Sequence, residues 1–146
     1  LLLILGISLY SYGFEAIVTD VTDGDTIKIE HQNKQIKVRL AGIDTPELKQ
    51  AFGLESKKAL EQKVLYKKVF VDGEKEDRYG RLIAHIKIGS RWINKELVEE
   101  GFAWHYKQYS KDQVLATAES SAKKNGLGIW KDDKAIAPWI FRYINK

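Results

Sequence analysis

Two neighbouring segments with a strict two-residue alternation constrain the fold of this chain most. In residues 25–30, Ile27 and Ile29 alternate with Lys28 and Glu30, and in residues 35–41 three apolar side chains, at positions 36, 38 and 40, alternate with charged ones at 37 and 39. A period of two places alternate side chains on opposite faces of a β-strand. The strand-like segment 14–22 precedes them, and Asp23-Gly24 is a typical hairpin turn signal. The sequence therefore predicts an antiparallel meander whose apolar face forms the core.

The rest of the sequence predicts two more strands and three helices. The strands cover residues 69–72 and 82–88, and the helices cover about 54–65, 92–100 and 110–125. Ser110 with Gln113 forms a capping box for the third helix, and Gly126 ends it. With about five strands, mostly first, the fold class is α+β with a mainly β core, a small barrel or twisted sheet covered by helices.

The first ten residues form an uncharged apolar run of the size found in signal peptides. It is shorter than the ~20 residues that cross a bilayer, and small residues stand at positions 11 and 13. We expect a signal peptide over residues 1–13, with its basic segment before this sequence, and a domain over 14–146 with a tail from about 131. The protein would then be secreted, periplasmic or at the cell surface. An uncleaved anchor and a buried first strand are the alternatives.

Composition removes several functional classes. The chain has no cysteine, which excludes a disulfide scaffold, a zinc ribbon and a thiol nucleophile. Its 146 residues fit one domain, and the net charge of +4 mildly favours an anionic partner.

Three carboxylates stand where the predicted strands end. Asp25 follows the hairpin turn, and Asp44 and Glu47 belong to an Asp-Thr-Pro-Glu segment after the third strand. Each has an ordinary interpretation, as a turn residue or as part of a helix start with proline at its first position. Together, however, Asp25 and Asp44 are able to share a hard cation such as Ca²⁺, and Glu47 is placed to act as a general base.

Two arginines add an affinity for phosphate. Arg39 lies on the polar side of the third predicted strand, and Arg81 ends a charged loop between two later strands. Taken singly, each reads as an ordinary solvent-facing residue. A guanidinium group, however, matches phosphate oxygens two at a time. A cation, two arginines and a carboxylate base are the components of phosphodiester hydrolysis.

The order of these motifs resembles the thermonuclease family, also called staphylococcal-nuclease-like. The matching motifs are Asp-Gly-Asp-Thr (23–26), Arg-Leu-Ala-Gly-Ile-Asp-Thr-Pro-Glu (39–47), Asp-Arg-Tyr-Gly-Arg (77–81) and Gly-Leu-Gly-Ile-Trp (126–130). Pro138-Trp139 resembles a pair near the end of many bacterial members. The resemblance implies an OB-type five-stranded barrel with three helices.

The resemblance also implies roles for the matched residues. Three match the protein ligands of a single Ca²⁺: Asp25, Asp44 and, through its backbone carbonyl, Thr45. Three match the catalytic set: Arg39, Arg81 and, as general base on water, Glu47. Tyr79 matches a nucleotide-binding tyrosine, and Tyr106 and Tyr109 compete for the place of a second.

The implied activity is a calcium-dependent endonuclease that cleaves DNA and RNA and leaves 3′-phosphate ends. We expect a preference for single strands, whose bases are accessible to tyrosines, and a monomer without a stable protein partner. One departure is the segment 48–53, which is shorter and less basic than the lysine-rich loop of some members. The alternative is a non-catalytic OB-type module that binds nucleic acid.

Overall fold

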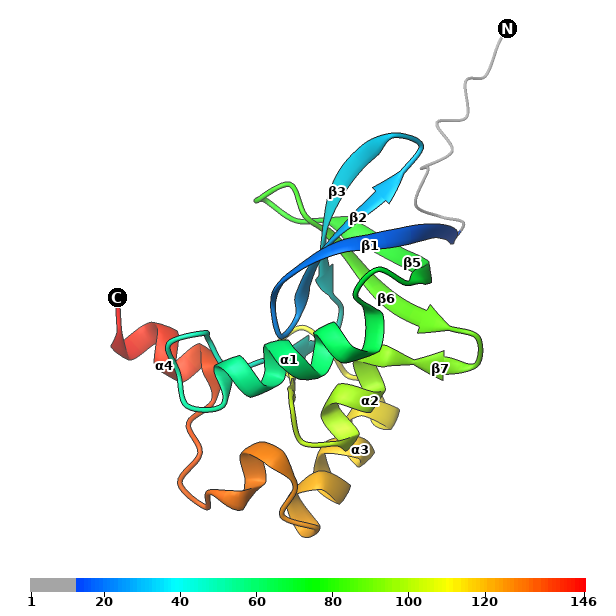
Figure 1. Cartoon of the computed structure of the whole chain (residues 1–146). Coiled ribbons are helices and arrows are strands. Elements are labelled where there is room, and N and C mark those ends of the chain that lie inside the picture. Colours follow the sequence, from blue (N-terminus) through cyan, green and yellow to red (C-terminus); the bar gives the residue numbers. More distant parts are fainter. Residues whose placement is uncertain (1–12) are drawn as a thin grey trace, which may run out of the picture.

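The computed structural model describes residues 13–146 (Figure 1), so the predicted signal peptide lies outside the described residues, apart from Gly13. The longer strands are β1 (Phe14–Asp23), β2 (Thr26–His31), β3 (Lys34–Leu40), β5 (Lys68–Glu76) and β6 (Leu82–Ile88). The short strands are β4 (Ile43–Asp44), β7 (Arg91–Trp92) and β8 (Trp104–His105). The helices are α1 (Gly53–Val64), α2 (Ile93–Glu99), α3 (Gln113–Lys124) and α4 (Pro138–Ile144), with a 3₁₀ turn, η1, at Gly128–Lys131.

The five longer strands close into a barrel. They follow the order β3-β2-β1-β5-β6 with antiparallel neighbours, and a parallel pairing of β3 with β6 completes the circuit. Val38 lies opposite Leu82, and Leu40 lies opposite Ala84. This confirms the predicted OB-type five-stranded barrel and its mainly β core.

The apolar face of the predicted meander forms the barrel interior. Ile27 and Ile29 of β2 and Val38 of β3 are fully buried, as the alternation predicted. Leu60 of α1 and Leu97 of α2 are also fully buried and belong to the same core cluster. The helices therefore cap the barrel on its open side, below the strands in Figure 1.

Asn94 joins the helical layer to the barrel closure. Its side-chain oxygen accepts from Ile86 N at 2.9 Å, and its amide nitrogen donates to the carbonyls of Ala41 at 2.9 Å and Ala84 at 3.3 Å. The fully buried amide thus ties α2 to β6 and to the turn that leads into β4.

Two local predictions need correction. The cap of α3 is Asp112, whose carboxylate accepts from Val114 N and Leu115 N, while Ser110 instead contacts His105. The helix predicted over about 54–65 is present as α1, which begins at Gly53, so the alternative of a helix start at the Asp-Thr-Pro-Glu segment does not hold. Finally, the described part of the chain holds four α-helices rather than three, since the tail forms α4.

Candidate active site

Arg39 binds two predicted cation ligands at once. Its Nη2 lies 3.3 Å from Asp25 Oδ2 and 3.2 Å from Asp44 Oδ1. Its Nη1 donates to the carbonyls of Leu40 at 2.7 Å and Ile43 at 2.9 Å. All three charged side chains are largely buried, with exposures of 13% for Arg39, 7% for Asp25 and 2% for Asp44. The barrel end thus gathers Asp25, Arg39 and Asp44, which span 19 positions of the sequence, into one ion-paired group.

Thr45 fixes the distance between the two carboxylate-bearing segments. Its backbone N donates to Asp25 Oδ2 at 2.8 Å. The β1–β2 turn also approaches it so closely that a Cβ on Gly24 would lie 2.7 Å from Thr45 Oγ1. Glycine is required here by this close approach, which keeps Asp25 next to Asp44.

Glu47 follows in a tight turn stabilised by Gln50. Gln50 N donates to the Glu47 carbonyl at 2.8 Å, and Glu47 N donates to Gln50 Oε1 at 3.1 Å. Gly53 packs directly against the Glu47 carbonyl, where a Cβ would clash with backbone. The carboxylate itself is 39% exposed, so it is held next to the buried group yet open to solvent.

Arg142 is a member of the cluster that sequence reasoning missed. This α4 residue lies 2.8 Å from Asp44 Oδ2 through Nη2 and 2.8 Å from Glu47 Oε1 through Nη1. Its Nη1 also donates to Asp44 Oδ1 at 3.2 Å, and its Nη2 donates to the Tyr106 hydroxyl at 3.4 Å. The only local signal was Pro138, which favours the first turn of a helix.

The cluster perturbs several ionisations. Burial, with a further contribution from Asp25, raises the pKa of Asp44 to about 6, although Arg142 and Arg39 oppose that rise. Burial and the neighbouring Asp25 raise the pKa of Asp23 to about 7. Burial also disfavours the charged form of Asp25, but Arg39 and the hydrogen bonds to this carboxylate outweigh it and lower the pKa. Perturbed carboxyl groups gathered at one place are typical of functional sites.

Arg81 and Tyr79 lie in a separate loop between β5 and β6. Asp77 accepts from the backbone N of both residues at 2.9 Å and pairs with Arg81 Nε at 2.8 Å. Within the described residues, the ion pairs of Arg81 involve Asp77 and no carboxylate of the cluster. Since Leu82 pairs with Val38, Arg81 enters β6 beside the strand that carries Arg39. The structure therefore places Arg81 near β3 but without a direct contact to the cluster.

The two remaining tyrosines differ in their relation to the cluster. Tyr106 is half-buried, donates its backbone N to the Gly42 carbonyl at 2.9 Å, and is bonded to Arg142 through its hydroxyl. Tyr109 packs edge-on against Tyr106 at 4.8 Å and is 69% exposed. Tyr106 thus borders the cluster directly, whereas Tyr109 lies on its outer side.

The oxygen atoms of the cluster have the chemistry that a hard cation requires. Within residues 13–146, His, Asp and Glu form no group of three or more arranged to hold a metal ion. Asp25 and Asp44 nevertheless converge on one guanidinium nitrogen, and the Thr45 backbone follows directly. Carboxylate and carbonyl oxygens are the ligands that Ca²⁺ prefers. The residues therefore fit a sparse, oxygen-only site with two side-chain ligands.

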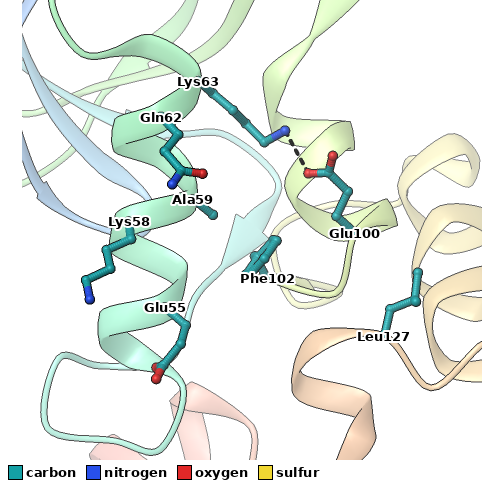
Figure 2. Close-up of a pocket in the computed structure, with 8 residues that line it drawn as sticks. All are labelled: Glu55, Lys58, Ala59, Gln62, Lys63, Glu100, Phe102 and Leu127. Carbon is teal, nitrogen blue, oxygen red and sulfur yellow. Dashed lines mark ion pairs between the residues drawn. The ribbon is translucent and has the colours of Figure 1, made fainter.

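A pocket on the described surface lies away from this cluster. The pocket, of about 610 Å³, opens between α1 and the α2–α3 side (Figure 2), where the Lys63–Glu100 ion pair bridges it at 2.7 Å. Its lining residues are Glu55, Lys58, Ala59, Gln62, Lys63, Glu100, Phe102 and Leu127. None of the candidate site residues lines it. The polar cluster at the barrel end, rather than this pocket, is the candidate active site. No helix among residues 13–146 is long and apolar enough to span a bilayer.

Comparisons with known proteins agree with the geometry. The sequence model of the family described as "Staphylococcal nuclease homologue" matches residues 37–132. A Haemophilus influenzae protein named "Uncharacterized endonuclease" is 44% identical over 126 residues, which cover 86% of this chain and 71% of the relative. A Shigella flexneri protein named "Micrococcal nuclease" is 35% identical over 144 residues, 91% of this chain and 83% of the relative.

A third relative, from Escherichia coli O157:H7 and also named "Uncharacterized endonuclease", is 36% identical over 127 residues, 86% of this chain and 83% of its own. The matches agree with the enzyme prediction rather than with the non-catalytic binding module. The chain belongs to the staphylococcal nuclease homologue family and is an endonuclease that acts on nucleic acid.

Proposed function

We propose that this endonuclease is calcium-dependent, cleaves DNA and RNA alike, and leaves 3′-phosphate ends. The observation that carries the proposal is the convergence of Asp25 and Asp44 on Arg39, with Glu47 bound to the same cluster through Arg142. This arrangement puts two candidate cation ligands, a phosphate-binding group and a base within one small volume.

Glu47 is the candidate general base. The Gln50 turn fixes its backbone, and its partly exposed carboxylate, which pairs with Arg142, would take the proton from the attacking water. A positioned base of this kind contributes on the order of a hundred- to ten-thousand-fold in rate. As Glu47 takes one proton from the attacking water, the water oxygen would bond to phosphorus while the bond to the 5′-oxygen breaks, and the leaving 5′-oxygen would take up a proton from solvent.

Arg39 and Arg81 would stabilise the negative charge that grows on the phosphoryl oxygens. Interactions that strengthen in the transition state raise the rate rather than merely bind substrate. Each such preorganised contact is typically worth about 3–4 kcal/mol. Arg39 is fixed by two carbonyls and two carboxylates, whereas Arg81 pairs with Asp77 and lies over the Tyr79 ring, two contacts within its own loop.

Asp25, Asp44 and the Thr45 carbonyl would hold the calcium ion. When bound, the ion would neutralise charge on the phosphate and on the buried carboxylates. With only two carboxylate ligands, we expect weak affinity, toward the millimolar end that suits calcium-rich surroundings. Such an affinity is consistent with an exported protein, which remains part of the proposal together with its signal peptide.

We also propose that single-stranded substrate is preferred and that the protein acts as a monomer. Tyr79, whose ring lies next to the Arg78 and Arg81 guanidinium groups, is 67% exposed, and Tyr109 is 69% exposed, so both side chains are accessible to unpaired bases. Tyr106 is less accessible and already bonded to Arg142. Of the two competing tyrosines, Tyr109 is therefore the better candidate for base stacking and Tyr106 for a contact closer to the phosphate.

The test is cleavage of heat-denatured DNA by the full chain, with calcium and then with a chelator, beside Glu47→Gln. Glu55→Gln is the matched control, since Glu55 is an exposed α1 residue outside the cluster. We expect calcium-dependent cleavage that falls at least a hundredfold in Glu47→Gln and stays unchanged in Glu55→Gln. Equal cleavage by both variants would refute the role of Glu47, and equal cleavage in chelator would refute the calcium dependence.

A further inference from the structure

The C-terminal helix α4 delivers a positive charge into the proposed cation site. Arg142 reaches both carboxylate oxygens of Asp44, at 2.8 and 3.2 Å, and also Glu47 Oε1 at 2.8 Å. Burial disfavours its charged form, but the bonds to the two carboxylates outweigh this and raise the pKa of Arg142. The guanidinium is therefore charged at every physiological pH, and it occupies oxygens that a calcium ion would need.

The other contacts of α4 lie near its start, where Pro138 is buried and Trp139 packs edge-on against Trp104 at a centroid distance of 5.5 Å. Trp139 stacks on the Tyr106 ring at 5.4 Å and an interplanar angle of 6°, and Gln50 Nε2 donates to the Ile136 carbonyl at 2.6 Å. The outer face of the helix stays bare, with Tyr143 72% exposed and Ile144 66% exposed. In Figure 1, α4 lies at the edge of the molecule, beside the loop that precedes α1. A helix with so small a packed face is able to move without disturbing the barrel core.

Asp44 has little room for a calcium ion while Arg142 is bound to it, and the two positive charges would repel each other. A carboxylate offers about four lone-pair positions, and Asp44 already accepts from Arg39 and twice from Arg142 through Oδ1 and Oδ2. A divalent ion on the same oxygens would also stand within a few ångströms of the guanidinium charge, at a cost of several kcal/mol in a partly buried site. Occupancy by one cation therefore disfavours the other.

From these contacts we propose that Arg142 is a tethered competitor of calcium, a positioning residue that holds Asp44 and Glu47 until the ion displaces it. The inference rests on the proposed calcium dependence. The apparent affinity for calcium falls by about the factor by which the arrangement with Arg142 bound to Asp44 is favoured over the arrangement without that contact. A tenfold preference for the Arg142-bound arrangement would thus weaken calcium binding about tenfold.

The experiment is calorimetric titration of calcium into the nucleic-acid-free full chain and into Arg142→Gln and Lys146→Gln. Lys146→Gln removes the same charge from the same tail, but the Lys146 ammonium lies over the Tyr143 ring rather than on the cluster. We expect Arg142→Gln to bind calcium at least fivefold more tightly and Lys146→Gln to match the parent chain. Arg142→Lys, which keeps the charge and loses the two-pronged contact, should fall between them.

A second readout follows the helix itself. The Trp139 ring leaves Tyr106 if Arg142 is displaced, so calcium should change tryptophan fluorescence in the parent chain and not in Trp139→Phe. Equal calcium affinity in Arg142→Gln and the parent chain, weaker affinity in Arg142→Gln, or an equal gain in Lys146→Gln would overturn the competition while leaving the calcium-dependent nuclease intact. If no chain bound calcium and cleavage ignored chelator, the proposed calcium dependence would fail and the competition with it.

Discussion

Replacement of Asn94 by alanine should strongly lower the stability of the domain. The fully buried side chain accepts from Ile86 N and donates to the carbonyls of Ala41 and Ala84. Ala84 O keeps its bond from Ala41 N at 2.7 Å, so the variant leaves two buried groups without these partners, Ile86 N and Ala41 O. Each such group costs about 1–3 kcal/mol. We therefore expect Asn94→Ala to lower the free energy of unfolding by about 4 kcal/mol, a large share of the ~5–15 kcal/mol of a typical domain.

Urea denaturation of the full chain, followed by tryptophan fluorescence, measures this loss. Asn145→Ala is the matched control, because the exposed Asn145 amide makes one bond to the Phe141 carbonyl. The control should change stability by less than ~0.5 kcal/mol. Asn94→Asp should cost at least as much as Asn94→Ala, since it turns a carboxylate toward two carbonyls. A loss below ~1 kcal/mol in Asn94→Ala would refute the claim that this amide closes the barrel.

Three further predictions concern charge and capping. Hydrogen bonds from Arg91, with Lys63, lower the pKa of Glu96 from 4.5 to about 2, so its stabilising effect is present above pH 4.5 and lost as pH falls toward 2. Glu96→Gln should then lower the free energy of unfolding in urea by about 1–2 kcal/mol at pH 7 and leave it unchanged near pH 2. An equal loss at both pH values would contradict this prediction. Because the pKa of Asp44 is raised to about 6, protons should compete with calcium for this carboxylate below that pH. Calorimetric titration should therefore show weaker calcium binding at pH 5 than at pH 7.5, and equal affinities at the two pH values would refute the competition. Asp112→Ala removes the cap of α3 and should lower the stability of the domain by about 1 kcal/mol, seen as a lower midpoint temperature of thermal unfolding. An unchanged midpoint would show that Asp112 does not stabilise the start of α3.

The barrel strands could be predicted because their signal is local. The alternation around Ile27 and Val38 depends only on neighbouring residues, and both side chains are buried as expected. The parallel pairing of β3 with β6 that closes the barrel came instead from the family resemblance, because strand partners far apart in sequence leave no periodic signal.

The local errors arose where two residues of similar propensity compete. Ser110 and Asp112 are both good helix caps, and the contact of Ser110 with His105, a tertiary interaction, leaves the cap to Asp112. Similarly, Pro46 suits a helix start, but the Gln50 turn and a left-handed Phe52, with φ of 73°, delay α1.

The candidate-site residues near the start of the chain could be predicted from sequence motifs, whereas the contribution of the C-terminal helix could not. Asp25, Arg39, Asp44 and Glu47 lie in two short motifs, and the structure brings them together. Arg142 lies 98 residues from Asp44 and 95 from Glu47, and it reaches them only because α4 folds back onto the site. A lone arginine in an unassigned tail gives no sequence signal for such a contact.

The most direct test of the central claim is the fate of the water oxygen during cleavage. A short single-stranded DNA oligomer is digested by the full chain with calcium in H₂¹⁸O, and the fragments are weighed by mass spectrometry. If water activated by Glu47 attacks phosphorus and expels the 5′-oxygen, each cut should yield a 3′-phosphate that carries one ¹⁸O and a fragment with a free 5′-hydroxyl. Products with a labelled 5′-phosphate, or 3′-phosphates without label, would contradict the account.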